Sequence, residues 1–422
     1  MPIPGRVLVT LAPLLLVLTA CGPPAPAPTA DASRLSHAGP DGDPGWSVSP
    51  PRAASTAAGA LVVWSQRPAG GAATVLALPV GSDGRPVGDR ARVSEPGEDA
   101  DAPAVASSPD ARSVAVTWTS RRRDRSVVRV RVLSPGGRPR AGAVTVSPSP
   151  AATPDVVAVG EGWVVAWRGA VRGEREIWWR RLDAHGTPLA PARRASHAGG
   201  DGDAGTGASF PSLAAGPLGV FAAWRPEGAP AADDELEVYG RTIPDGAVVR
   251  LSFTGADGDV RFAVGPPDVA AAADGFLVAW SGDTTVVGER EIWLARLAGD
   301  GTPVAAPERV TTVGTPGNTE ASALGPALAC GPPGCLVAWW GDPEQPPLEP
   351  DENEVFARRV APLPSPPVRL SSAGPDGEYL FAALDPAVAA GPGGWLVTWK
   401  ADDDALPLAN DEFEVYARAV SG

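Results

Sequence analysis

A short segment ending in Trp recurs seven times along the 422-residue chain and constrains its fold more than any other feature. The anchor Trp residues are separated by 49 to 60 residues and are Trp64, Trp118, Trp167, Trp224, Trp280, Trp339 and Trp399. Four strands of about five residues with their turns need roughly this length. Such a unit matches one blade of a β-propeller and exceeds one coil of a β-solenoid. The repeat predicts an all-β chain, a seven-bladed β-propeller of four-stranded blades.

The segments around the anchor Trp indicate how the blades pack. Residues 162–167, 275–280 and 394–399 align without gaps, and each contains two aromatic residues four positions apart. Alternate strand residues take opposite faces, so both aromatics point the same way and are expected to pack on the neighbouring blade. The preceding strands, such as 268–272 and 386–390, are interpreted as small throughout, as expected where blades crowd around the axis.

A third strand begins with Glu and ends with Arg in five of the copies. The segments are Glu176–Arg181, Glu237–Arg241, Glu291–Arg296, Glu354–Arg358 and Glu414–Arg418. An ion pair between each Glu and a neighbouring Arg is expected. A catalytic residue need occur only once, so the recurrence favours a structural role.

The two ends of the chain predict how the ring closes. The last copy stops at Gly422, one strand short, while residues 34–43 match residues 369–378. The N-terminal strand is therefore expected to complete the last blade, which pairs both ends of the chain and removes an exposed sheet edge.

The N-terminus has the features of a secretory leader. Arg6 precedes a run rich in Leu and Val that is too short to span a bilayer comfortably. The run ends Leu18-Thr19-Ala20-Cys21-Gly22, which resembles the bacterial lipobox. The resemblance implies that residues 1–20 are a lipoprotein signal peptide and that Cys21 carries diacylglycerol and a further acyl chain such as palmitate. Gly22, where Asp would be the alternative, resembles the default for sorting to the outer membrane, so we expect a lipid-anchored protein of the cell envelope.

Residues 21–33 are rich in Pro and Ala and predict an extended tether. Residues 34–422 then form the propeller. After lipidation of Cys21, Cys330 and Cys335 remain and flank a four-residue turn. A hairpin brings such residues together, so a disulfide is expected in an oxidising compartment.

The charge balance narrows the classes of partner. The chain has 49 acidic and 35 basic residues, a formal net charge of −14. Such a surface repels phosphate backbones, so no nucleic-acid partner is expected. The membrane, reached through the lipid anchor, is the first predicted partner.

Loops that join consecutive blades and loops that join second and third strands emerge on one face. This face carries the long segments 226–235, 342–354 and 402–412, and long loops on a rigid ring favour binding. It also carries a repeated acidic motif whose carboxylates could ligate Ca²⁺, although Asp-Gly is also a common turn dipeptide. The motif residues are Asp41, Asp43, Asp201, Asp203, Asp257, Asp259, Asp376 and Glu378.

The LVxW and E-[IV]-[WYF]-x-x-R patterns resemble exported bacterial propellers, which implies a fold and leaves the function open. WD and kelch signatures are absent from the sequence, as are the common hydrolase motifs. We therefore expect a binding or scaffold protein that holds a protein, peptide or glycan on its long-loop face. The alternatives are a propeller hydrolase of glycosidase type, with carboxylates around the channel mouth, and a calcium-dependent adhesin. A buried carboxylate cluster of perturbed acidity at that mouth would favour the enzyme.

Overall fold

The structure is a computed structural model, and every regular element in its described part is a β-strand. It describes residues 31–422 except 172, 198–206, 227–235, 257–258, 344–346, 349, 404–406 and 409–410. The predicted leader, Cys21 and most of the predicted tether lie outside the described residues.

Four of the sheets contain four antiparallel strands each. The first joins β1 (Ser33–Arg34) to β29 (Phe413–Ser421), β28 (Gly394–Asp402) and β27 (Ala382–Gly391). The second contains β7 (Asp99–Ser107), β8 (Val114–Arg122), β9 (Arg125–Leu133) and β10 (Val144–Thr145). The third contains β11 (Ala151–Val159), β12 (Gly162–Val171), β13 (Glu174–Leu182) and β14 (Arg193–Arg194). The fourth contains β15 (Ala208–Gly216), β16 (Gly219–Pro226), β17 (Tyr239–Ile243) and β18 (Val249–Arg250).

The remaining strands form two larger sheets that repeat the same unit. A five-stranded sheet contains β2 (Ser47–Val48), β3 (Arg52–Thr56), β4 (Gly59–Arg67), β5 (Thr74–Gly81) and β6 (Ala91–Arg92). An eight-stranded sheet contains β19 (Asp268–Ala272), β20 (Gly275–Asp283), β21 (Arg290–Ala298), β22 (Glu308–Arg309), β23 (Ser322–Gly331), β24 (Gly334–Asp342), β25 (Glu354–Ala361) and β26 (Val368–Arg369). Its two halves are joined by one parallel residue pair, Arg290 with Ser322.

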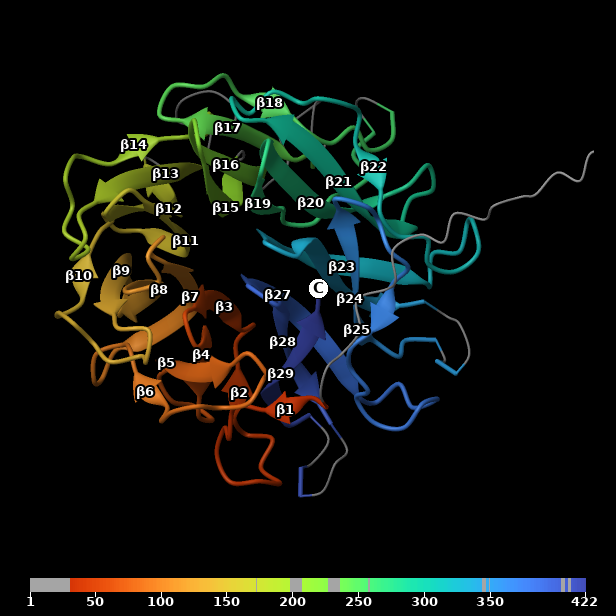
Figure 1. The fold of residues 1–422 in the computed structure, drawn as a ribbon, viewed down its shortest axis with the longest axis horizontal. Helices are drawn as coiled ribbons and strands as arrows, with labels where there is room; N and C mark the ends of the chain where they lie inside the picture. The colour runs from red at the N-terminus through yellow and green to blue at the C-terminus, as the bar shows by residue number, and fades with distance from the viewer. Residues whose placement is uncertain are drawn as a thin grey trace, which may run out of the picture.

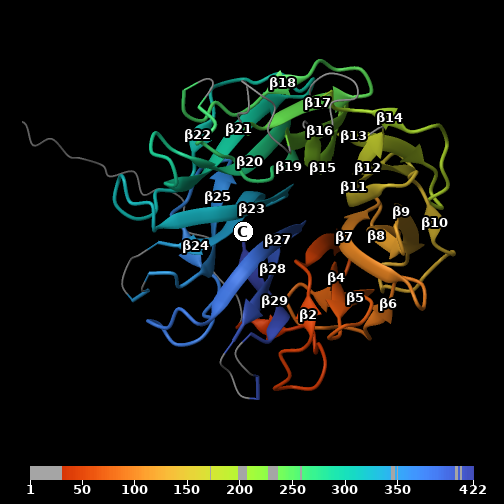
Figure 2. The ribbon, with the colours of Figure 1, turned by 180° about the vertical axis from the view of Figure 1, so that it is seen from behind.

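The sheets stand side by side around a common axis, which is the arrangement of a β-propeller. Figure 1 and the reverse view in Figure 2 place β3, β7, β11, β15, β19, β23 and β27 innermost. The first and last strands are neighbours, because Ser33 and Arg34 of β1 lie opposite Ala417 and Tyr416 of β29.

The anchor Trp side chains pack between adjacent sheets. Trp163 and Trp167 on β12 are 1% and 0% exposed and share one cluster with Val128 and Val130 of the neighbouring sheet. Burying aromatic rings of this size supplies much of the stability of such an interface. The prediction that both aromatics of each segment pack on the next sheet is confirmed for this segment.

The recurring Glu is buried and joins three parts of each unit. In the last unit Glu414 accepts hydrogen bonds from the Ser36 hydroxyl and from the Ala38 amide nitrogen, at 2.8 Å for the amide. Arg34, on the outer strand, forms an ion pair with Glu414. The same Glu–hydroxyl contact recurs as Glu176–Ser196, Glu237–Ser252, Glu291–Thr311 and Glu354–Ser371. These contacts support the structural interpretation of the repeated Glu.

The Arg at the end of the same strand has a different partner. Arg418 donates to the carbonyl oxygen of Leu370 in the preceding unit at 2.7 Å, and Arg180 donates to that of Val146 at 3.0 Å. The ion-pair partner of each Glu is thus the outer-strand Arg, while the third-strand Arg connects neighbouring units.

Replacing Glu414 with Ala should lower the free energy of unfolding by about 3 kcal/mol, because Arg34, Ser36 and the Ala38 amide would lose a buried acceptor. Denaturant midpoints measure the effect. The control is Glu308→Ala, which removes an exposed ion pair with Arg296 and should cost below about 1 kcal/mol. Equal losses of unfolding free energy in the two variants would contradict a stabilising role for the buried contacts of Glu414.

Candidate functional site

One register position on the innermost strands breaks the repeat. At this position, the inner-strand residue lies opposite the second-strand residue that immediately precedes the anchor Trp. The seven residues, called here the axial layer, are Arg52, Ala104, Asp155, Ser212, Asp268, Ala327 and Ala387. Three units carry Ala at this position, and four carry a polar side chain. Because Ala satisfies the fold, the polar side chains are candidates for chemistry.

A β-bulge precedes the axial layer in five of the units. The ladder shifts register between Ala152 and Asp155 and between Ser209 and Ser212, for example. The residue two positions before the axial layer has a positive φ, such as 47° at Thr153. Bulges bend a strand and re-aim its side chains. In these five units the bend lies just before the axial layer, whereas β3 and β19 reach it without a bulge.

The polar side chains of neighbouring units are linked by hydrogen bonds. Asp155 accepts from the Leu213 amide nitrogen at 2.7 Å. The Ser212 hydroxyl accepts from the Val269 amide at 3.0 Å and donates to the Asp268 carboxylate at 3.0 Å. Two of these three contacts reach a backbone N–H of the next innermost strand, and the third joins the Ser212 and Asp268 side chains. The open edges of these strands therefore hold the carboxylates in place.

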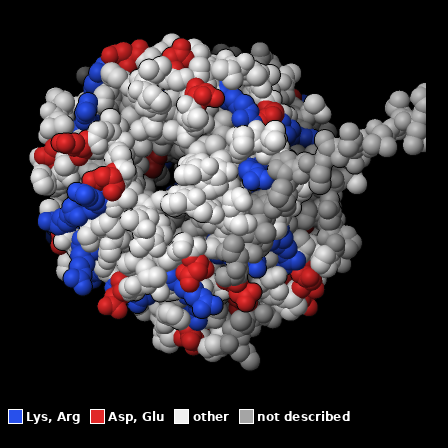
Figure 3. Space-filling view, in the orientation of Figure 1, with Lys and Arg blue, Asp and Glu red and all other residues white. Residues whose placement is uncertain are grey.

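Asp268 completes this chain on the far side. Its carboxylate also accepts from the Leu328 amide nitrogen at 2.7 Å. Asp155, Ser212 and Asp268 are consequently fixed across consecutive units around the axis. Figure 3 shows that one face is hollowed near the middle of the ring, with an acidic side chain at the edge of the hollow.

The acidity of the two carboxyls is shifted by their surroundings. The pKa of Asp155 is raised to about 7, mainly by burial and in smaller part by the negative charge of Asp268, against the Leu213 and Val156 amides and the charge of Arg52, which lower it. Burial likewise raises the pKa of Asp268, which the Leu328 amide and Arg52 oppose. Both side chains remain partly exposed. They are surrounded by protein on most sides and still reach solvent.

A carboxyl of pKa near 7 can donate a proton at neutral pH, and a nearby carboxylate can act as base or nucleophile. Arg52 supplies the positive charge that both carboxyls feel. The axial layer thus offers two carboxyls, one hydroxyl and one guanidinium. This set fits acid–base chemistry on an uncharged oxygen-rich substrate.

The predicted calcium ligands have other contacts where the structure describes them. Asp41 forms an ion pair with Arg34, and Asp376 forms one with Arg369, both at 2.7 Å. Asp259 pairs with Arg261. Asp43 accepts from the Gly45 amide nitrogen at 2.9 Å. Glu378 is exposed, and its amide nitrogen donates to the Pro375 carbonyl. Asp201, Asp203 and Asp257 lie outside the described residues.

One acidic cluster does form in the described part of the chain. Ligand atoms of Asp41, Glu412 and Glu414 lie within 4.8 Å of one another. The Arg34 guanidinium contacts both Asp41 and Glu414, so a protein cation already lies between two of the three carboxylates. Glu412 also accepts from the Gly42 amide at 2.8 Å. Calcium binding by the repeated motif stays a prediction.

Two of the long loops close in the same way. The Asp342 carboxylate accepts from the amide of Asp351, and the Asp402 carboxylate accepts from the amide of Asp411 at 2.7 Å. Each loop thereby returns to the sheet at a fixed point. The long segment 226–235 lies almost entirely outside the described residues.

The predicted disulfide is present, since Cys330 and Cys335 are bonded across the turn between β23 and β24. It joins facing residues of the ladder between β23 and β24.

The axial layer itself was missed by sequence reasoning, which took strands such as 268–272 to be small throughout. Asp268 contradicts that expectation because its carboxylate binds edge amides, which Ala cannot do. The available signal was the alignment of every inner strand on its anchor Trp. That alignment separates the polar residues from Ala104, Ala327 and Ala387.

Comparison with known proteins gives no family. No family model and no curated protein matches the chain. Among solved structures, a prolyl endopeptidase matches 84% of this chain at 14% identity with a TM-score of 0.48, and this chain spans 45% of its length. The GH93 α-L-arabinofuranosidase of Fusarium graminearum matches 76% at 14% identity, with 92% of its own chain covered and a TM-score of 0.47. A neuraminidase-like protein of a bat influenza virus, subtype N10, matches 79% at 9% identity, with 97% of its own chain covered and a TM-score of 0.44. Similarity at this level carries no argument about activity. Among the described residues, no helix is long and apolar enough to cross a membrane.

The raised pKa of Asp155 predicts a pH-dependent penalty on stability. An unfolded Asp releases its proton near pH 4. The folded carboxyl keeps its proton up to about pH 7. Wild-type stability should therefore fall over this window relative to Asp155→Asn. Denaturant unfolding at pH 4 to 8 measures the difference between the two proteins, which should grow with pH.

The control is Asp110→Asn. Asp110 is exposed, and hydrogen bonds from Ser108 and Arg112 lower its pKa. Its difference from wild type should stay constant above pH 4. A constant difference for Asp155→Asn as well would contradict the shifted acidity.

Proposed function

We propose that this chain is a lipid-anchored envelope protein whose seven-bladed propeller, closed by the N-terminal strand, hydrolyses glycosidic bonds at the axial layer. The observation that carries the proposal is the pair Asp155 and Asp268, two carboxyls of raised pKa at a position where three other units carry Ala. The pairing of β1 with β29 and the radial arrangement of the sheets support the closed ring.

The roles follow from the contacts. Asp155 acts as the proton donor to the leaving oxygen, because its pKa of about 7 keeps a proton available at neutral pH. Asp268 acts as the second carboxylate, oriented by the Ser212 hydroxyl and the Leu328 amide. The positive charge of Arg52 limits how far the pKa values of both carboxyls rise.

Glycosidic bonds fit this set better than amides. Cleavage of an acetal needs one carboxylic acid and one carboxylate. Amide cleavage by a hydroxyl nucleophile instead needs a base such as imidazole in contact with it. The Ser212 hydroxyl contacts a carboxylate and a backbone amide. The substrate class we infer is therefore a neutral glycan.

A second candidate is binding through the loops that join consecutive units. Phe253 and Tyr379 are each 65% exposed on two of these loops, and Val260 and Leu380 are 57% and 53% exposed beside them. Exposed aromatic and aliphatic side chains favour contact with a protein, peptide or glycan. Such a surface would serve a scaffold, and it would also hold a glycan near the axis.

Replacing Asp155 or Asp268 with Asn should lower glycan hydrolysis at least 100-fold, because each change removes a proton donor or a carboxylate. The assay measures reducing ends released from a panel of polysaccharides and aryl glycosides by the mature, detergent-solubilised protein. Asp110→Asn is the matched control and should keep wild-type turnover. No release by the wild type, or full activity in both Asn variants, would leave the binding role as the better account.

The anchor is tested separately. Wild-type protein should incorporate labelled palmitate and partition into the detergent phase of Triton X-114. Cys21→Ser should do neither, because the acyl chains predicted on Cys21 are what anchors the protein in the membrane. Detergent-phase partitioning of both proteins would contradict lipidation at Cys21.

A further inference from the structure

Four of the loops that enter consecutive units carry a turn Gly followed, seven residues later, by a side chain that packs on it. In three loops the later residue is aromatic, and the pairs are Gly39–Trp46, Gly255–Phe262 and Gly374–Phe381. A Cβ added at Gly374 would lie 2.3 Å from the Phe381 ring, so the ring covers the Gly closely. In the fourth loop, Gly314 has Ala321 at this position, and the corresponding distance is 2.5 Å.

In two of these loops the ring packs against the hydrophobic core between two sheets. Trp46 packs against the cluster that contains Trp64, and Phe381 packs against the cluster that contains Trp399. The cluster that contains Trp339 uses equivalent strand positions, with Cys335 in place of Trp395 and Phe356 in place of Tyr416. Its loop contributes Ala321, which is fully buried. At this loop position the interface thus has the small side chain of Ala321 where the two other loops place a ring.

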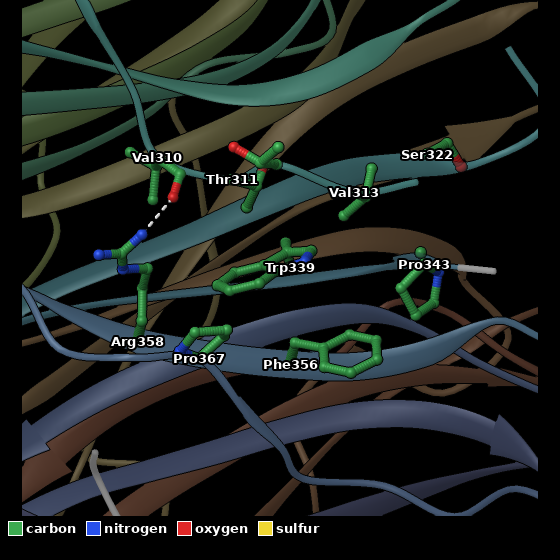
Figure 4. Close-up of a pocket in the computed structure, with 11 residues that line it drawn as sticks. Val310, Thr311, Val313, Ser322, Trp339, Pro343, Phe356, Arg358 and Pro367 are labelled. Carbon is green, nitrogen blue, oxygen red and sulfur yellow. Dashed lines mark hydrogen bonds between the residues drawn. The ribbon is translucent and has the colours of Figure 1, made fainter. Parts of the chain in front are cut away.

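A cavity of about 290 Å³ lies at this interface. Val313 and Ser322, which flank Gly314 and Ala321 in the sequence, both line it. Figure 4 shows Val310, Thr311 and Val313 in one row, Phe356 and Pro367 across from them, and Trp339 between the two rows. Trp339 and Phe356 stack with ring centroids 6.0 Å apart.

We propose that this cavity binds a small molecule through a single aromatic ring of phenyl to indole size. The neighbouring interfaces show which occupant fits, because an aromatic side chain of the chain itself packs at the corresponding place. A preformed apolar cavity of this kind takes up a ring that restores the lost contacts. The volume lies at the lower end of ligand pockets, which limits the ligand to about one ring system.

Polar groups in the cavity wall would orient a bound ring. The Arg358 guanidinium donates to the Val310 carbonyl, and both residues line the cavity together with Thr311. The apolar surface comes mainly from Trp339, Phe356 and two Pro residues. A ring that stacks on Trp339 would therefore place its edge toward polar groups. This site is independent of Asp155 and Asp268.

Indole is the probe for the test, with calorimetry for stoichiometry and ligand-observed saturation-transfer NMR for contact. Wild type should bind one indole per chain. Ala321→Phe should weaken binding at least tenfold, because the new ring fills the space. Phe381→Ala should create a second cavity of the same kind and raise the stoichiometry to two. Asp155→Asn should bind indole like the wild type, so indole binding can be tested independently of whether the protein is a hydrolase.

A second filling variant covers the case in which Ala321→Phe disturbs the turn at Gly314. Val313→Phe fills the cavity from the opposite side of that turn and should also weaken binding at least tenfold. No binding of indole by the wild type would overturn the proposal. So would wild-type affinity in both filling variants with their folds retained.

Discussion

The packing of an indole ring between adjacent sheets sets the geometry on which the rest of the structure depends. Each anchor Trp is buried on the second strand of its unit, and the neighbouring sheet supplies aliphatic side chains against it. Because the ring fixes the separation between sheets, the innermost strands approach one another closely around the axis. Residues such as Ala104 and Ala327 fit there, and their backbone edges face the next unit.

The axial carboxyls stand out against this background. Asp155 and Asp268 bind the edge amides of the next unit, which is a structural contribution, yet three other units do without a side chain that can do so. Desolvation makes the charged forms costly at this depth, as the raised pKa values indicate. Two of seven equivalent positions carry this cost, which supports the proposal that the two carboxyls take part in acid–base chemistry.

Much of the fold follows from the sequence because its signals are local and repeated. The Trp spacing and the match between residues 34–43 and 369–378 predict the units and the pairing of β1 with β29. The hairpin spacing of Cys330 and Cys335 predicts the disulfide. The partner of each Glu was less predictable, since the outer-strand Arg reaches it only after the sheet has formed. Asp268 lies on a strand without a bulge and was taken as part of a run of small residues, because the sequence does not mark which inner-strand side chain binds the edge amide of another unit. In five other units a bulge shifts the register just before this position, and the sequence does not mark it either.

The Asp155 carboxyl holds its proton to about neutral pH because of its burial and the negative charge of Asp268. Direct titration by NMR, with ¹³C at the Asp carboxyl carbons and Asp155→Asn to assign the signal, tests this most directly. We expect a midpoint at about 7 in the wild type and a lower one in Asp268→Asn, where a negative charge is removed. A midpoint near 4 in the wild type, unchanged by Asp268→Asn, would contradict it.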